Sequence, residues 1–241
     1  MATIYASTND GYVAENVASN AWNTAHDNTA GDSVSINDSS YDLAVHVSCV
    51  TLGRITTYKI SRTLMDFDTS GISSAPSAAT LKIYGVTNGG ADLIVIKATH
   101  DPSSASTGWF SDFTGYAAGW DDGDVTAYSS EIATWSTSRY NDITLNSTAL
   151  SDMSSLSTFK IMIMEYDHDY LDFSPGGGRI PCVSVSSGMY FADNTGTSKD
   201  PYIDYTPAVT GYGHDVLGVA SGDIASINGV ATADISKVSG V

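Results

Sequence analysis

The stretch that decides the fold reads RTLMDFDTSGI from residue 62 to residue 72 and ATLKIY from residue 79 to residue 84. Its first part predicts a β-strand that ends in a turn, because Asp68, Ser70 and Gly71 are residue types that favour tight turns. In its second part, Leu81 and Ile83 share one side of a strand, which is the pattern of a strand with one buried face. The two parts therefore predict consecutive strands of a β-sheet.

Three residues of this stretch have structural roles that follow from their chemistry. We expect the Phe67 ring to lie in the core. The Asp68 carboxylate is expected to accept backbone N–H bonds within its own turn. Arg62 is expected to be held by a carboxylate or by backbone carbonyl groups, because a guanidinium carries several donors that need acceptors.

The same pattern of an arginine, an apolar residue, Phe-Asp, a small-residue turn, an isoleucine and then Ala-x-Leu-x-Ile-Tyr resembles the centre of jelly-roll modules called DNRLRE domains, which are relatives of carbohydrate-binding modules. Three other pieces resemble the opening, later and closing strands of that family in the expected order: Ala6-Ser7 with Asp10-Gly11-Tyr12-Val13, Trp135 with Ile143-Thr144-Leu145, and Pro201-Tyr202-Ile203-Asp204-Tyr205. The resemblance covers residues 1–207 and implies a jelly-roll sandwich.

Length and composition agree with one all-β domain. The chain has 241 residues, and all-β sandwiches of this size often form a single domain. Only 15% of the residues are charged, and Ser, Thr, Gly, Asp and Tyr are abundant, which suits short strands joined by tight turns. We therefore expect an all-β jelly-roll β-sandwich over residues 1–207, followed by a short repeat tail over residues 208–241.

The charge of the chain argues against two classes of partner. With 10 basic and 27 acidic residues, the net charge is -17, so the average field repels nucleic-acid phosphates and anionic membranes. No window approaches the run of about 18 apolar residues that a transmembrane helix needs. We expect no nucleic-acid partner and no membrane insertion.

Two other segments predict strands. Asn88-Gly89-Gly90 separates the apolar runs 81–86 and 93–96, which is typical of a β-hairpin. Residues 159–164, FKIMIM, are largely apolar on both faces and predict a central strand that is covered on each side. Residues 101–124 combine glycines and aromatic residues without a single period, so we expect a long loop with aromatic anchors.

Cys49 and Cys182 both lie in strand-like runs, where cysteines are usually small buried thiols. A disulfide between them is the alternative. The first residues, MATIYA, contain no basic run and no long apolar core, so we expect synthesis in the cytosol without a signal peptide.

The sequence lacks the common catalytic motifs. It has no Gly-x-Ser-x-Gly elbow, no His-Glu-x-x-His, no phosphate-binding Gly-x-x-x-x-Gly-Lys-Ser/Thr and no Cys-x-x-Cys pair. We therefore expect no enzymatic activity. The five histidines are scattered, and His168 between Asp167 and Asp169 is the one suggestive case.

Calcium is the one cofactor that the sequence suggests. Asp121, Asp122 and Asp124 lie in an acidic loop with a glycine, and such loops supply the oxygen ligands that calcium prefers. The resemblance to carbohydrate-binding jelly rolls also implies a structural calcium. Because no complete calcium-loop motif is present, a solvated loop is the favoured interpretation and the metal site is the alternative.

Trp109 and Trp120 are candidates for binding a glycan, because such a site needs flat aromatic rings flanked by polar groups. The alternative places both rings in the core, since a sandwich of this size needs several buried tryptophans. Trp135 is expected in the core.

Residues 208–241 contain a repeat with a step of 11 residues. Gly-Val-Ala at 218–220 recurs at 229–231, and Asp-Ile at 223–224 recurs at 234–235. Each unit is too short to bury its own apolar side, so we expect the tail to become ordered by association. The residues expected to make this assembly contact are Val219, Ile224, Ile227, Val230, Ile235 and Val238.

The tail also resembles Gly-Val and Ser-Ile repeats at the ends of phage structural proteins, which are made in the host cytosol and leave by lysis. The expected function is that of a phage virion structural protein, a capsid decoration, fibre or tail-associated subunit. Its expected partners are other virion proteins and copies of itself. The alternative is a carbohydrate-binding module that recognises a surface polysaccharide, and a displayed module could also bind a host glycan.

Overall fold

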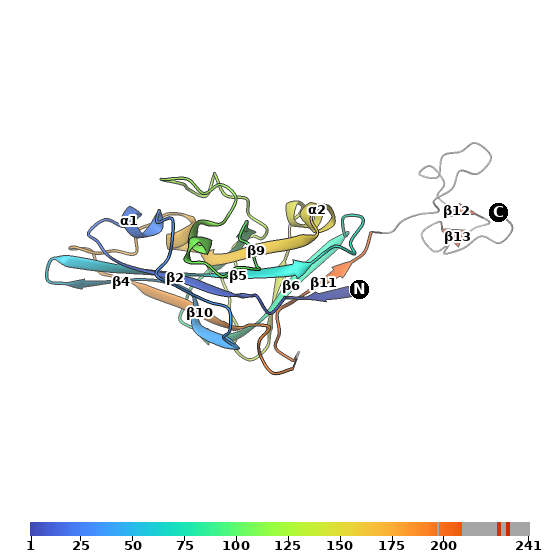
Figure 1. The fold of residues 1–241 in the computed structure, drawn as a ribbon, viewed down its shortest axis with the longest axis horizontal. Helices are drawn as coiled ribbons and strands as arrows, with labels where there is room; N and C mark the ends of the chain where they lie inside the picture. The colour runs from blue at the N-terminus through green and yellow to red at the C-terminus, as the bar shows by residue number, and fades with distance from the viewer. Residues whose placement is uncertain (197, 209–225, 228–229, 232–241) are drawn as a thin grey trace.

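A computed structural model describes residues 1–196, 198–208, 226–227 and 230–231 of the chain. The expected all-β class is confirmed, because eleven strands of the sandwich form one antiparallel sheet (Figure 1). The strands are β1 (Ala2–Tyr5), β2 (Gly11–Ala18), β3 (Ser33–Ser35), β4 (Ser40–Leu52), β5 (Ile55–Asp68), β6 (Ala78–Asn88), β7 (Leu93–Lys97), β8 (Tyr140–Thr144), β9 (Thr158–Glu165), β10 (Ser184–Tyr190) and β11 (Tyr202–Thr206). The helical turns are α1 (Asn23–His26), η1 (Thr107–Ser111), α2 (Ser147–Ser155) and η2 (Tyr166–Tyr170).

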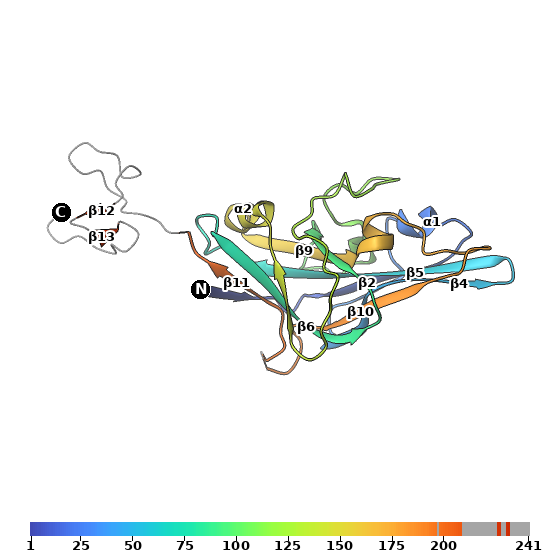
Figure 2. The ribbon, with the colours of Figure 1, turned by 180° about the vertical axis from the view of Figure 1, so that it is seen from behind.

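The long strand β5 joins the two layers of the sandwich. Along one edge, its residues 55–61 pair with β4 and its residues 63–68 pair with β9, while β2 occupies the other edge. Beyond this shared edge, β9 and β7 continue one layer, and β4, β10, β6, β8 and β11 form the other. Figures 1 and 2 show this arrangement from opposite sides.

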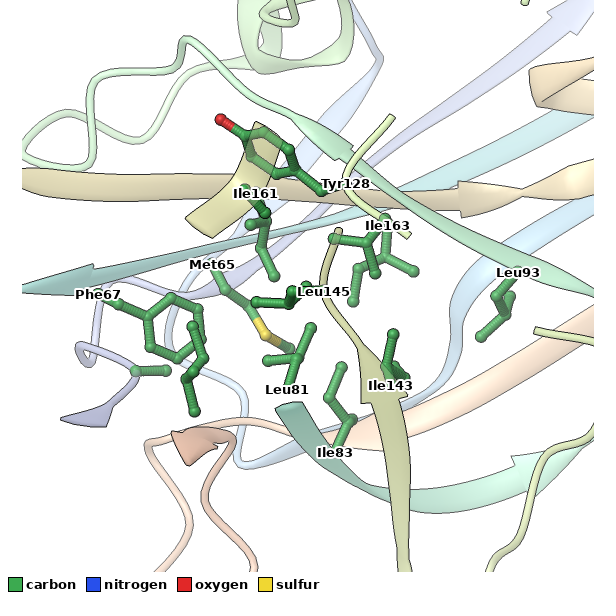
Figure 3. Close-up of a cluster of buried hydrophobic side chains, with 14 of the residues drawn as sticks. Met65, Phe67, Leu81, Ile83, Leu93, Tyr128, Ile143, Leu145, Ile161 and Ile163 are labelled. Carbon is green, nitrogen blue, oxygen red and sulfur yellow. The ribbon is translucent and has the colours of Figure 1, made fainter. Parts of the chain in front are cut away.

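The first core fills the space between the two layers (Figure 3). Met65 and Phe67 of β5 lie in it with Leu81 of β6, and all three side chains are completely buried. The expected core position of Phe67 is confirmed. The turn after β5 also has its expected contact, because the Ser70 N–H donates to the Asp68 carboxylate at 3.0 Å.

A second core covers the outer face of the layer that contains β5 and β9. Along β9, Ile161 and Ile163 point into the first core, whereas Met162 and Met164 point into the second. The prediction of a central strand that is covered on each side is therefore confirmed. The cover includes α1, η1 and aromatic side chains of the loop 101–124, which is the anchored loop that the sequence predicts.

The turn at residues 88–90 does not form the predicted hairpin. β6 pairs with β8, β10 and β11, whereas β7 pairs with β9, so the chain passes from one layer to the other at this turn. The turn residues specify a reversal of the chain, but they do not specify a strand partner. Leu93, Ile94, Val95 and Ile96 are all buried, and this burial on both faces decides that β7 lies beside β9.

Cys49 and Cys182 form a disulfide, so the favoured interpretation as two separate thiols is wrong. Cys49 lies in β4, and Cys182 lies shortly before β10, which pairs with β4 through Ser184 opposite Ser48. This register brings the two cysteines together. Their sequence separation of 133 residues gives no sign of it.

Strand β11 closes the sandwich between β1 and β6. It ends at Thr206, whose carbonyl accepts the N–H of Ser77 at 2.9 Å. Farther along the chain, β12 (Ser226–Ile227) and β13 (Val230–Ala231) pair with each other. Of the expected assembly residues, four lie outside the described part of the chain: Val219, Ile224, Ile235 and Val238. Within the described part, no helix has the length and apolar character needed to cross a bilayer.

Candidate functional site

The two tryptophans predicted to bind a glycan are both buried. Trp109 lies in η1 and is 1% exposed, and Trp120 in the following loop is 0% exposed. The Trp120 ring stacks on His26 at 4.3 Å between ring centres, and the Trp109 ring meets His100 edge-on at 5.0 Å. Both rings belong to the second core, so neither offers a face to a sugar in this structure.

The composition of the loop 101–124 explains where Trp109 and Trp120 lie. An aromatic loop without a period fastens itself to a sheet through its large side chains, so Trp109 and Trp120 serve as the anchors of that loop. Trp135 is buried in the first core as expected, and its Nε1–H donates to the Gly188 carbonyl at 3.0 Å. An exposed aromatic surface must therefore be sought on the strands rather than on this loop.

The three aspartates predicted to bind calcium lie on an exposed turn. The Asp121 carboxylate accepts the N–H of Gly123 at 2.9 Å, and the Asp124 carboxylate accepts the N–H of Asp121 at 3.4 Å. Among the residues that the structure describes, no three Asp, Glu, His or Cys side chains are grouped so that they could hold a metal ion. Calcium binding at Asp121, Asp122 and Asp124 stays a prediction.

A buried ion pair lies in the second core. Arg62 and Asp169 have no exposed side-chain surface, and the guanidinium donates from Nε and Nη2 to the two carboxylate oxygens at 2.9 and 2.6 Å. Its Nη1 donates to the Phe110 carbonyl, and its central carbon lies 3.9 Å from the centre of the Phe110 ring. The prediction that a carboxylate or carbonyl groups hold Arg62 is confirmed.

Glu165 positions Asp169. Its carboxylate lies at the start of η2 and accepts the backbone N–H groups of Asp167, His168 and Asp169 at 2.6 to 3.2 Å. Burial raises the pKa of Glu165 to about 6, against the opposing effect of these hydrogen bonds. The turn that Glu165 caps directs the Asp169 side chain toward Arg62.

The ion pair continues into α1 through His26. Its Nε2 donates to the Asp169 carbonyl at 2.8 Å, and its Nδ1 lies 2.8 Å from the Asp27 carboxylate. Arg62, Asp169 and His26 come from three distant segments and are all buried. The network therefore holds the covering segments on the sheet.

The sequence singles out His168 between Asp167 and Asp169, and the structure brings Asp169 rather than His168 to Arg62. His168 bonds to the Phe173 carbonyl through Nδ1 at 2.7 Å and takes no part in the ion pair. The available signal was an aspartate one short turn after a buried strand, in a chain that also places an arginine within a buried strand. Such an arginine needs a carboxylate partner.

The outer face of the layer that contains β6, β8, β10 and β11 carries a continuous row of tyrosines, which we call the tyrosine stripe. Successive ring centres are 5.5, 5.0, 5.3 and 5.8 Å apart in the order Tyr5, Tyr202, Tyr140, Tyr84 and Tyr190. Buried residues such as Ile203 and Ile83 alternate with these tyrosines along the strands. Because alternate residues of a strand point to opposite faces, the tyrosine stripe faces away from the first core.

Charged side chains flank the tyrosine stripe. Lys199 donates to the Tyr190 hydroxyl at 2.8 Å, and its ammonium lies 4.0 Å from the centre of that ring. Lys82 forms an ion pair with Asp142 at 2.8 Å. Aromatic rings beside a few polar groups form the kind of surface that binds small ligands and sugars. No local pattern in the sequence marks this surface, because its five tyrosines come from five different strands.

A group of aspartates surrounds Asp10, which is completely buried. One of its carboxylate oxygens accepts the N–H of Ala192 at 2.9 Å, and the other has no partner within the described residues. Burial raises the pKa of Asp10 to about 8, with the nearby carboxylates of Asp193, Asp66 and Asp200 acting in the same direction and the hydrogen bond from Ala192 opposing them. Asp10 is therefore mostly a neutral acid at pH 7.

Comparison with known proteins adds no family to these observations. Neither a scan against protein-family models nor a search of curated proteins finds a match to this sequence. The resemblance to DNRLRE domains stays a prediction, and the function has to be argued from the chain itself.

Proposed function

We propose that the protein is a phage virion structural protein, a capsid decoration, fibre or tail-associated subunit, that displays its sandwich and attaches through residues 208–241. One observation carries the proposal: the sandwich closes before the repeat begins. Strand β11 pairs with β1 and β6, and the described strands β12 and β13 of the tail pair with each other rather than with the sandwich.

The described strands of the repeat do not pair with the sandwich, so we expect the repeat to have another partner. Ile227 and Val230 lie directly opposite each other in β12 and β13. With the step of 11 residues, Ile227 recurs as Val238, Val230 matches Val219, and Ile224 recurs as Ile235. A unit of 11 residues cannot bury such an apolar side alone. Copies of the chain or another virion protein would supply the missing surface.

Location tests this proposal directly. Antibodies against the sandwich should label purified particles at many symmetry-related positions in electron micrographs. Particles from which the chain is absent by mass spectrometry, although the infected cell makes it, would contradict the proposal.

The second candidate function is glycan binding, and the tyrosine stripe is the observation that favours it. A polysaccharide chain laid across the stripe would stack on rings such as Tyr202 and Tyr140 and exchange hydrogen bonds with Lys82 and Asp142. The two functions are compatible, because a displayed module can also bind a glycan on the host.

Binding of soluble polysaccharides, followed by calorimetry, tests this second function. Tyr202→Ala and Tyr140→Ala should each weaken binding roughly two- to tenfold if one stacking contact is lost. Thr144→Ala, a change to an exposed residue of β8 outside the stripe, is the control. Tryptophan fluorescence should stay constant during the titration because Trp109 and Trp120 are buried. If a sugar quenches tryptophan fluorescence and binds the tyrosine variants as tightly as the unaltered chain, the glycan site lies on the loop with Trp109 and Trp120.

A further inference from the structure

One end of the sandwich carries exposed apolar side chains that we call the apolar tip. Ten large apolar residues of the described chain are exposed, and six of them lie here: Val50, Leu52, Ile55, Phe173, Ile180 and Val183. Leu52 is 77% exposed and Ile180 is 68% exposed. Large exposed apolar groups that gather in one place mark an interaction surface in a folded protein.

The apolar tip is built from two segments that are fastened together. The hairpin of β4 and β5 is joined to the segment before β10 by the disulfide between Cys49 and Cys182. The Tyr58 hydroxyl donates to the Gly176 carbonyl at 3.1 Å, and the Gly178 N–H donates to the Thr56 hydroxyl at 3.2 Å. The six side chains are therefore presented by a fixed backbone.

The position of the apolar tip is set by the strand register. Leu52 lies opposite Ile55, and Val50 lies opposite Thr57, so these side chains share one side of the hairpin. The Val183 carbonyl accepts the Cys49 N–H at 3.2 Å and so lies beside β4, whereas the Gly178 N–H contacts Thr56 on the other side of the hairpin. The apolar tip therefore has apolar side chains on both sides of the hairpin end. Figures 1 and 2 show this hairpin at the opposite end of the sandwich from the N-terminus and β11.

The charge of this end differs from that of the rest of the chain. The chain has a net charge of -17, yet residues 43–65 and 173–192 contain no Asp or Glu. Arg54, Lys59 and Arg179 are exposed in these two segments. The nearest acidic residue in the sequence is Asp172, whose carboxylate accepts the Trp22 Nε1–H at 2.7 Å. The apolar tip is thus flanked by cations in an otherwise anionic protein.

We propose that the apolar tip binds a lipid surface with anionic headgroups. Leu52, Ile55 and Ile180 enter the boundary between headgroups and acyl chains, and the nearby arginines contact lipid phosphates. Apolar side chains beside Lys or Arg are the composition of interfacial membrane contacts. A sugar would not match this surface, because five of its six apolar side chains are aliphatic.

The net charge of the chain predicts repulsion from anionic membranes, and the apolar tip is the one place where we propose attraction. The average field of the chain repels anionic membranes, but the tip presents its own cations to the surface and charges beyond a Debye length of about 8 Å are screened at physiological salt. The contact is interfacial and needs no spanning segment. It also does not depend on the proposed virion function, because the tip belongs to the sandwich.

Flotation of the full chain with lipid vesicles tests the proposal. The chain should float with vesicles of phosphatidylcholine and phosphatidylglycerol in equal amounts, and less with phosphatidylcholine alone. The double variant Leu52→Ser/Ile55→Ser should lower the partition coefficient at least about tenfold, since each buried aliphatic side chain contributes roughly that factor. The matched control is Leu43→Ser/Leu156→Ser, which changes two exposed leucines outside the tip and should leave the partition coefficient unchanged.

A separate pair of variants tests how the arginines of the tip contribute to binding of anionic lipids. Arg54→Gln/Arg179→Gln should weaken binding to the mixed vesicles and leave binding to phosphatidylcholine unchanged, whereas Arg139→Gln, an exposed arginine before β8, should change neither. Melting temperatures equal to that of the unaltered chain establish that the variants fold.

Three results would overturn the proposal. The first is no flotation with either vesicle. The second is an equal loss of binding in the tip and control variants. The third is a smaller oligomer of the Leu52→Ser/Ile55→Ser variant in light scattering, which would assign the tip to a second copy of the chain.

Discussion

The ring of Phe67 is completely buried between the two layers of the sandwich. Phe67→Ala should lower the free energy of unfolding by about 3–5 kcal/mol, because it removes apolar contacts and leaves a cavity in a packed core. Chemical denaturation measures this loss. Phe173→Ala, which removes an exposed ring, should change stability by less than about 0.5 kcal/mol. Equal effects of the two changes would contradict the central position of β5.

The buried pair of Arg62 and Asp169 predicts non-additive effects. Arg62→Met or Asp169→Leu alone should cost about 3–5 kcal/mol, because each leaves an unpaired charge in the second core. The double variant should cost less than the sum of the two by at least about 1 kcal/mol, since no charge is then stranded. Unfolding free energies of the four proteins form the required cycle, and additive losses would show that the two groups do not interact.

Asp10 predicts a specific dependence of stability on pH. Its pKa is raised from 3.8 to about 8 in the folded chain, so the folded state keeps a proton that the unfolded state releases. The contribution of Asp10 to stability is therefore fully present below about pH 4 and is lost as the pH rises to about 8. Asp10→Asn cannot ionise, and its stability relative to the unaltered chain should increase across this range.

The control for Asp10 is Asp122→Asn, since Asp122 is exposed. This change also removes one carboxylate from the chain, but it leaves the buried Asp10 in place. A flat stability difference between Asp10→Asn and the unaltered chain from about pH 4 to about pH 8 would mean that Asp10 does not keep its proton in the folded chain.

At the scale of elements, the disulfide ties the β4–β5 hairpin to the segment before β10. It spans 133 residues, so its loss should lower stability by roughly 2–5 kcal/mol through the greater freedom of the unfolded chain. Differential scanning calorimetry with and without a reductant measures the effect. The Cys49→Ser/Cys182→Ser variant should melt at the reduced temperature in both conditions. A reductant that leaves the melting temperature unchanged would show that the bond is not formed in solution.

The disulfide also limits the compartment in which the chain can reach its oxidised form. Cytosolic thiols are kept reduced, so a virion protein made in the host cytosol would fold first and form the bond after lysis. We expect the two layers and both cores to form without the bond, because strand pairing and burial contribute most of the contacts of the sandwich. The reduced chain should therefore fold, with the apolar tip as the part that is most affected.

At the scale of the whole molecule, the sandwich and the tail are predicted to have separate tasks. A chain that ends at Pro207 retains every strand of the sandwich through β11. It should keep the melting temperature of the sandwich and lose its oligomeric state or its place on the particle. Light scattering and incorporation into particles measure these properties. If the truncated chain keeps both its oligomeric state and its place on the particle, the tail has no role in assembly.

A second variant distinguishes the effect of the apolar side chains of the tail from the effect of the length of the tail. Replacing Ile227 and Val230 by serine leaves the tail at full length and removes two of the in-phase apolar side chains. It should weaken assembly in the same direction as the truncation, because association of the repeats depends on their apolar positions. Leu43→Ser, a change on the sandwich, should leave assembly unchanged.

Local patterns in the sequence were sufficient for several parts of this fold. The side-chain period of a strand is two residues, so FKIMIM at 159–164 defines two apolar faces without any knowledge of its neighbours. Turn chemistry is equally local, and the contact between Asp68 and Ser70 spans only two residues. The all-β class, the central strand, the core position of Phe67 and the need of Arg62 for an acceptor were all determined at this level.

The tertiary structure alone decided which distant residues meet. Trp109 and Trp120 have the composition of a sugar platform, but they are buried because the loop that carries them folds back over the sheet. The partner of Arg62 lies 107 residues away, and the partner of Cys49 lies 133 residues away. The tyrosine stripe and the apolar tip likewise combine residues from separate segments. A period shows that a face will be covered or left open, but strand register and loop packing decide what covers it, and these depend on contacts that no local pattern contains.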